Sequence, residues 1–149
     1  MPITMEQVLA QLYPDEPDYE RSAQLGPEAL PHLMQLVEEG DPELASKATY
    51  LASLINVQGS AEVVEKAARS TDPLLRVAAA ASLSNLEEMP TPLVESMLND
   101  RDVGVRKLTL RSLETQKTIG LKPKVEEIAE GDPNISLRQL ASRIANELS

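Results

Sequence analysis

The chain has 149 residues with 24 acidic and 14 basic side chains, a formal net charge of −10, and it contains no Cys, Trp or Phe. The absence of cysteine excludes disulfides, zinc–thiolate sites and thiol catalysis, and the negative charge opposes general binding to nucleic acid or to anionic membranes. No signal peptide or membrane span is recognisable, so we expect a cytoplasmic protein.

Leucine and alanine dominate the composition, with 22 and 16 residues. This mixture favours helices over strands, because sheets usually recruit β-branched and aromatic residues. The length fits one domain or one short array of repeats. We therefore predict an all-α protein in which residues 1–149 form a single domain.

The first 26 residues predict an irregular helical hairpin. Thr4 and Gln7 have the spacing of a capping box, which opens a helix that runs to about Tyr13. Residues 14–17 contain two prolines that end this helix, and a shorter helix follows, up to a break at residues 25–27. A degenerate hairpin of this kind is typical of the end of a repeat array.

Residues 27–149 contain four copies of a repeat of about 30 residues. Each copy is marked by an aspartate, and the separations between successive aspartates are 31, 30 and 30 positions: Asp41, Asp72, Asp102 and Asp132. An aspartate at an N-cap accepts a hydrogen bond from a free backbone N–H, and proline, which follows three of the four, is favoured at the first helical position. Each aspartate therefore predicts the start of a helix.

Each copy also predicts a helix before its aspartate, so that one copy is a hairpin of two helices. Apolar residues recur at helical spacing on both sides of each aspartate, for example at Ala48, Leu51 and Ile55. The predicted first helices cover residues 28–39, 60–70, 91–100 and 122–130. The predicted second helices cover residues 42–56, 73–87, 103–115 and 133–148.

The segment from Asp72 to Leu83, which reads DPLLRVAAAASL, resembles the HEAT-repeat superfamily and is most similar to the short HEAT-like repeats associated with phycobilin lyases. Weaker copies of the same pattern occupy residues 102–113 and 132–141. The resemblance implies a right-handed α-solenoid of about five helical hairpins. It also implies a binding role, which is the usual function of such repeats.

The family pattern includes an arginine early in the second helix. This arginine is present at Arg76 and Arg106 and is replaced by Ala45 and Ser136 in the other two copies. In HEAT-like arrays the equivalent arginine commonly bridges to the aspartate of a neighbouring repeat. The resemblance therefore implies a structural role for Arg76 and Arg106, with binding of an acidic partner as the alternative.

Catalytic, cofactor and metal sites are not predicted. The four aspartates are explained as helix caps, and His32, the only histidine, has no pattern of partners for a catalytic triad or a metal site. Adjacent carboxylates, as in residues 15–18 and 126–127, do not face each other across a cleft as paired catalytic acids do. We therefore expect no enzymatic activity.

The two sets of predicted helices differ in the sign of their charge. The second helices hold seven basic and four acidic residues, whereas the first helices hold four basic and ten acidic residues. Second helices generally line the concave face of HEAT-like solenoids, so this bias marks either a binding groove or a simple electrostatic balance between the layers. The candidate partner-binding residues are Lys47, Tyr50, Arg76, Arg106, Lys107, Arg111, Arg138 and Arg143.

These features predict a non-catalytic scaffold that binds a protein, for instance through an acidic segment of that protein, on the concave face of the solenoid. Two alternatives remain open at this point. The first is an enzyme, similar to phycobilin lyases or to other HEAT-repeat enzymes. The second is a subunit of a larger assembly, and the oligomeric state is not predicted.

Overall fold

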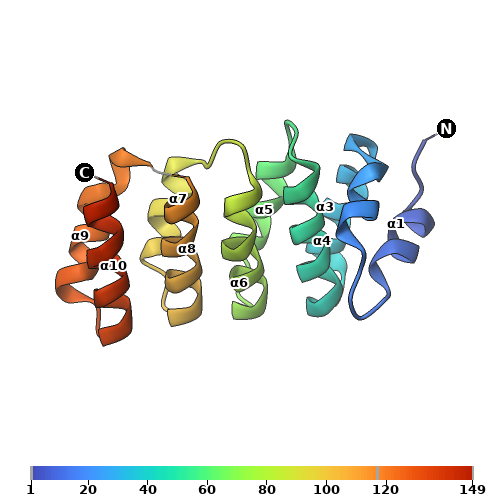
Figure 1. The fold of residues 1–149 in the computed structure, drawn as a ribbon. Coiled ribbons are helices and arrows are strands. Elements are labelled where there is room, and N and C mark those ends of the chain that lie inside the picture. Colours follow the sequence, from blue (N-terminus) through green and yellow to red (C-terminus); the bar gives the residue numbers. More distant parts are fainter. Residues whose placement is uncertain (1, 117, 149) are drawn as a thin grey trace. The chain divides into compact units, whose positions relative to one another are not determined.

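The computed structural model describes residues 2–116 and 118–148, so that Met1, Lys117 and Ser149 of the predicted single domain lie outside the described residues. Helices make up 76% of the structure, and no strand occurs in the described part of the chain (Figure 1). The prediction of an all-α protein is therefore confirmed. None of the described helices is long and apolar enough to cross a membrane.

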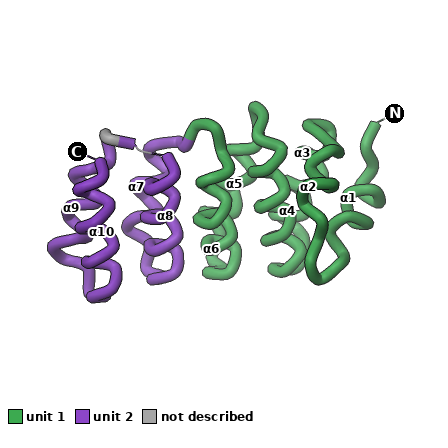
Figure 2. The backbone as a smooth tube through the Cα atoms, viewed as in Figure 1, with its two compact units in different colours: residues 1–88 green, residues 89–149 purple. Residues whose placement is uncertain are grey.

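The chain divides into two compact units, residues 1–88 and residues 89–149 (Figure 2). The α-helices of the first unit are α1 (Met5–Leu12), α2 (Tyr19–Ser22), α3 (Leu30–Glu39), α4 (Pro42–Ile55), α5 (Ser60–Ala68) and α6 (Pro73–Ser82). Short 3-10 helices occupy Ala23–Leu25, Pro27–Ala29 and Leu83–Asn85. The second unit contains α7 (Thr91–Leu98), α8 (Val103–Thr115), α9 (Lys122–Gly131) and α10 (Ile135–Glu147), with a 3-10 helix at Ile119–Leu121. The single domain over residues 1–149 stays a prediction.

Each unit is built from helices that pack in two layers (Figure 1). In the first unit α4 packs against α6, and α3 packs against α5. In the second unit α8 packs against α10, and α7 packs against α9. The largest fully buried side chains of the two cores are aliphatic: Val8, Leu12, Leu33, Leu51, Val63, Val64 and Leu83 in the first, and Leu98, Leu110, Leu113, Leu121 and Ile144 in the second.

The predicted helix starts are confirmed at four positions. The Thr4 hydroxyl accepts a hydrogen bond from the Gln7 N–H at 3.2 Å, and the Gln7 side chain accepts one from the Thr4 N–H at 2.8 Å, which completes the capping box. The other three confirmed N-caps are Asp41, Asp72 and Asp102. Their carboxylates accept hydrogen bonds from backbone N–H groups at 2.9, 2.9 and 2.7 Å, respectively.

The prediction that Asp132 caps the last second helix is wrong. Helix α10 begins at Ile135, two residues later than predicted, and its N-cap is Asn134, whose side chain accepts from the Leu137 N–H at 3.1 Å. The Asp132 carboxylate instead accepts the Asn134 N–H at 2.8 Å and receives a guanidinium group. Two cap-competent residues stand close together here, and a tertiary contact decides which of them opens the helix.

Other predicted helix ends also differ from the structure, two of them because a 3-10 turn replaces part of the α-helix. The second helix expected over residues 73–87 is regular only to Ser82 and continues as a 3-10 turn to Asn85. The first helix expected from residue 28 starts as a 3-10 turn at Pro27–Ala29 and becomes α-helical at Leu30. Tightening of the terminal turn to 3-10 geometry is a common way to end a helix.

Candidate functional site

Three of the predicted binding arginines have the same structural contact. Each occupies the fourth position after the N-cap of a second helix and donates Nη1 to the carbonyl oxygen six residues earlier: Arg76 to Ser70 at 3.1 Å, Arg106 to Asp100 at 2.9 Å and Arg138 to Asp132 at 2.7 Å. The guanidinium therefore ties the second helix to the turn that precedes it. This contact also places Arg138, and not Ser136, in the arginine position of the last repeat.

Arg106 makes a further contact that links two repeats. Its Nε and Nη2 donate to the two carboxylate oxygens of Asp132 at 2.8 and 3.2 Å. Only 13% of the Arg106 side chain and 4% of the Asp132 side chain are exposed. The pair has the bidentate geometry that makes arginine–carboxylate bonds strong. The bridge that the family resemblance implied is thus present at Arg106.

Lys47 and Tyr50 lie on α4 and contact the N-terminal hairpin. Lys47 Nζ donates to the carbonyl oxygens of Leu12 at 3.1 Å and Pro14 at 2.9 Å. The Tyr50 ring packs edge-on against Tyr19, with ring centroids 4.9 Å apart. Burial raises the pKa of the Tyr19 hydroxyl above its usual value of 10.0, and the neighbouring Tyr50 raises this pKa further. Both predicted binding residues therefore help to hold the hairpin.

The remaining three predicted residues, Lys107, Arg111 and Arg143, come together in one place. They line a cleft of about 560 Å³ between α8 and α10 in the second unit. The other lining residues are Val103, Asn134, Ser136, Leu137, Gln139 and Leu140. We call this feature the cationic cleft.

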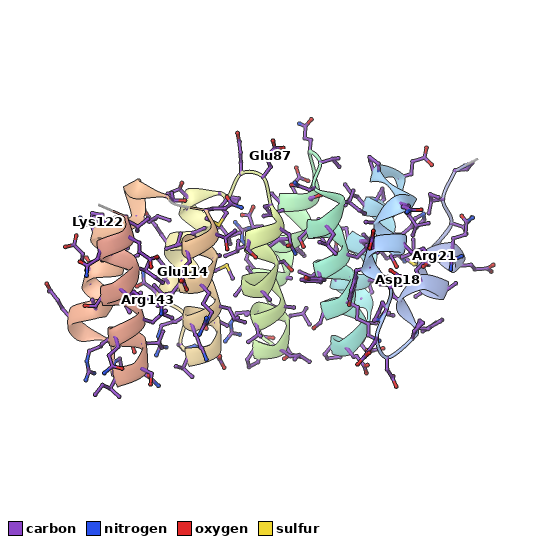
Figure 3. All side chains as sticks on the ribbon, viewed as in Figure 1. Asp18, Arg21, Glu87, Glu114, Lys122 and Arg143 are labelled. Atoms are coloured by element: carbon purple, nitrogen blue, oxygen red, sulfur yellow. The ribbon has the colours of Figure 1, made fainter. Side chains whose placement is uncertain are left out.

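The cations of this cleft are only partly neutralised. Lys107 and Arg111 lie one turn apart on α8, both are exposed, and neither has an ion pair within residues 2–116 and 118–148. Arg143, on α10, lines the same cleft and donates to Glu114 at 3.0 Å; both of these residues are labelled in Figure 3. Its Nε also lies 3.9 Å from a Glu147 carboxylate oxygen. Two cations of the cleft are thus available to an anion, and a third is shared with acidic neighbours.

The walls of the cationic cleft also offer apolar surface and hydrogen-bonding groups. Val103 is 44% exposed at the first position of α8, and Leu140 is half-buried on α10. Asn134, Ser136 and Gln139 add exposed amide and hydroxyl groups. None of these neutral residues is among the binding residues predicted from the sequence. Gln139 and Leu140 lie three or four positions from both Ser136 and Arg143, so these residues lie on one face of α10, and a helical projection of the sequence contains this signal.

A second cavity, of about 410 Å³, lies in the first unit and has a different character. Its lining mixes acidic and basic residues, and one of its basic residues, Arg69, forms an ion pair with Glu65 in the same lining. Such a surface largely satisfies its own charges. The cationic cleft is therefore the stronger candidate for a site that attracts a charged ligand.

Comparison with models of protein families and with curated proteins finds no match for this chain. Its function therefore has to be inferred from the chemistry of the site.

Proposed function

We propose that this chain is a non-catalytic protein-binding module of the cytoplasm, and that its cationic cleft holds an acidic segment of a partner protein. The observation that carries the proposal is the convergence of Lys107, Arg111 and Arg143 from two helices on one cleft. Lys107 and Arg111 have no ion pair within the described residues, so they are the cations that a carboxylate-bearing ligand would neutralise.

The cleft also favours a particular composition of the bound segment. An exposed ion pair contributes only about 0.2–1 kcal/mol, so pairs with three exposed cations would give weak binding by themselves. Val103 and Leu140 offer apolar surface beside the cations. An apolar or aromatic side chain of the ligand would add burial worth about 25 cal/mol per Å². We therefore propose an acidic segment that carries such a side chain between its carboxylates.

The scaffold of the proposed module is a right-handed solenoid of HEAT-like repeats. Three observations support it: consecutive helical hairpins, packing of each second helix on its neighbour within a unit, and an arginine with the same backbone contact in three repeats. In repeat arrays each unit cannot bury its apolar face alone, and stacked neighbours create a continuous binding surface. The cationic cleft, formed by two second helices, would belong to that surface.

The proposal is tested with a labelled synthetic peptide that contains alternating glutamate and leucine, titrated with the full chain and followed by fluorescence anisotropy. We expect binding at about 50 mM NaCl that weakens strongly at about 500 mM, because salt screens exposed charges. Arg111→Glu should lower the affinity at least about tenfold, since it replaces attraction by repulsion beside the ligand.

The matched control is Lys66→Glu, which makes the same change in charge at an exposed position of α5, outside the cationic cleft. This variant should bind the peptide like the unmodified chain. If both variants lose affinity to the same extent, only the overall charge attracts the peptide. If Arg111→Glu binds as well as the unmodified chain at low salt, the cationic cleft is not the binding site.

A further inference from the structure

The formal charge of the chain is distributed unequally between its two units. Residues 1–88 contain 15 acidic and 5 basic side chains, a net charge of −10. Residues 89–149 contain 9 of each sign and have no net charge. The net negative charge of the protein therefore comes from the first unit, whereas the cationic cleft belongs to the second. Two copies of this chain carry complementary surfaces.

The first unit presents an exposed acidic loop between α1 and α2. We call residues 13–18, which read YPDEPD, the acidic loop. Tyr13 is 67% exposed, and Asp15 and Glu16 are exposed with no hydrogen bond or ion pair within the described residues. Asp18, labelled in Figure 3, is the N-cap of α2 and accepts from the Arg21 N–H at 3.1 Å. The loop therefore offers an aromatic side chain followed closely by two free carboxylates.

The acidic loop is held in its shape before any contact is made. Lys47, whose side chain is only 13% exposed, donates to the carbonyl oxygens of Leu12 and Pro14 on either side of Tyr13. Two prolines further restrict the loop. A segment that is already ordered loses less entropy on binding than a flexible one. The role of Lys47 is thus to present the loop.

We propose that the acidic loop of a second copy of this chain occupies the cationic cleft. This inference rests on the proposed function of the cleft and names its ligand. Asp15 and Glu16 are the carboxylates for Lys107 and Arg111, and Tyr13 supplies the apolar surface for Val103 and Leu140. A ring of this kind also adds contact area at low entropic cost.

Such a contact joins different surfaces on the two partners. Two copies can exchange loops reciprocally in a symmetric dimer, or they can make the contact once and leave one loop and one cleft free. Head-to-tail contacts of this type continue into open chains or close into rings. In either arrangement we expect association that increases with protein concentration and that needs both the loop and the cleft.

Sedimentation velocity of the full chain over a range of concentrations, at about 50 mM and about 500 mM NaCl, tests this proposal. We expect the average sedimentation coefficient to rise with concentration at low salt and to stay at the monomer value at high salt. The loop variant Asp15→Lys/Glu16→Lys should reduce the association constant at least about tenfold.

The matched control is Glu87→Lys/Glu88→Lys, which makes the same change in charge at two other exposed residues of the first unit. Both double variants lower the net negative charge equally, which by itself reduces repulsion between copies. Loss of association in the loop variant with retention in the control supports the loop as the ligand. Equal behaviour of the two variants overturns it.

A mixing experiment gives the sharpest outcome. The cleft variant Lys107→Glu/Arg111→Glu keeps an intact loop, and the loop variant keeps an intact cleft. Each alone should remain monomeric, whereas a mixture should form one-to-one dimers and nothing larger, because only one intact contact exists per pair. A mixture that stays monomeric, or larger species from either variant alone, contradicts the proposal.

Peptide binding separates this inference from the proposed function and does not depend on the folding of any variant. A labelled peptide of residues 11–20 should bind the unmodified chain with an affinity that falls with salt. If the glutamate–leucine peptide binds but the chain is monomeric up to about 1 mM and residues 11–20 do not bind, the second copy is not the ligand and the cleft still binds acidic segments. If neither peptide binds, both proposals fail.

Discussion

The arginine side chains of the second helices divide into those that bind backbone carbonyl groups and those that line the cationic cleft. Arg76, Arg106 and Arg138 bind carbonyl oxygens of the preceding turn, and they are buried or half-buried. Arg111, on the same helix as Arg106, is exposed and lines the cationic cleft. Residue type alone does not separate the two roles, since all four are arginines in second helices.

The ion pair between Arg106 and Asp132 should be important for stability. Arg106→Ala should lower the free energy of unfolding by about 3–5 kcal/mol, because it leaves the Asp132 carboxylate buried without its counter-charge. Urea titration followed by circular dichroism measures this effect. The double variant Arg106→Ala/Asp132→Ala should cost less than the two single changes together. If the two effects simply add, the two groups do not interact. The control is Lys66→Ala, which changes an exposed residue and should alter the free energy of unfolding by less than about 0.5 kcal/mol.

The raised pKa of Tyr19 predicts a loss of stability in alkaline solution. Burial, and then Tyr50, hold the folded-state pKa above 10.0, so the unfolded chain releases this proton first. The contribution is fully present below pH 10.0 and is lost as the pH rises through the folded-state pKa. Thermal melts should therefore show a smaller alkaline loss of melting temperature for Tyr19→Phe than for the unmodified chain. An equal loss in both proteins would show that Tyr19 does not titrate as inferred.

Among the features of the helices, the sequence predicts their first residues best. The start of α10 shows the limit of that prediction. An N-cap bond joins groups only two or three residues apart, as at Asp72 and Leu74, so the local sequence contains both partners. At the start of α10 the local sequence contains two candidates, Asp132 and Asn134. Arg106, 26 residues earlier, binds Asp132 and leaves the cap to Asn134.

The corrected start of α10 leads to a direct test. Asn134→Ala should lower the free energy of unfolding by about 0.5–2 kcal/mol through loss of the N-cap bond, as should Asp72→Ala at the start of α6. Pro133→Ala should have a smaller effect, because Pro133 lies before the helix and not at its first position. A larger loss for Pro133→Ala than for Asn134→Ala in chemical denaturation would contradict this assignment of the cap.

At the scale of the whole molecule, the connection between the two compact units is exposed at two adjacent glutamates. Glu87 and Glu88 are exposed in the loop after α6, where Figure 3 labels Glu87, and the second unit begins at Met89. Connections with few backbone hydrogen bonds and exposed side chains are the preferred sites of proteolytic nicking. The net charge also differs on the two sides of this connection: it is −10 for the first unit and zero for the second.

Limited digestion with a glutamate-specific protease should therefore cut first after Glu87 or Glu88. Two fragments that correspond to the two units are expected, and intact-mass spectrometry identifies them. The exposed Glu16 should resist, because Pro17 follows it and restricts the backbone at the scissile bond. Early fragments from cuts inside α3, α5 or α9 would show that these helices open more readily than the connection between the units.

The sequence by itself determined the features of this protein that depend on neighbours along the chain. The helical class, the hairpin of two helices in each repeat and three of the four predicted aspartate caps follow from periodicity, proline and N-cap chemistry within a few residues. The excess of basic residues in the second helices was also visible in the sequence. The sequence did not indicate which of these basic residues bind groups of the protein itself.

Only the tertiary structure decided which of the eight candidate residues make internal contacts and which line a cleft. Lys47 and Tyr50 hold the N-terminal hairpin, three arginines bind the backbone, and Lys107, Arg111 and Arg143 meet across α8 and α10. The physical reason is that a cation binds the oxygen that packing brings within about 3 Å of it, wherever that oxygen lies in the sequence. Lys47 reaches a carbonyl 35 positions away, and Arg143 reaches a carboxylate 29 positions away, distances over which local pattern carries no information.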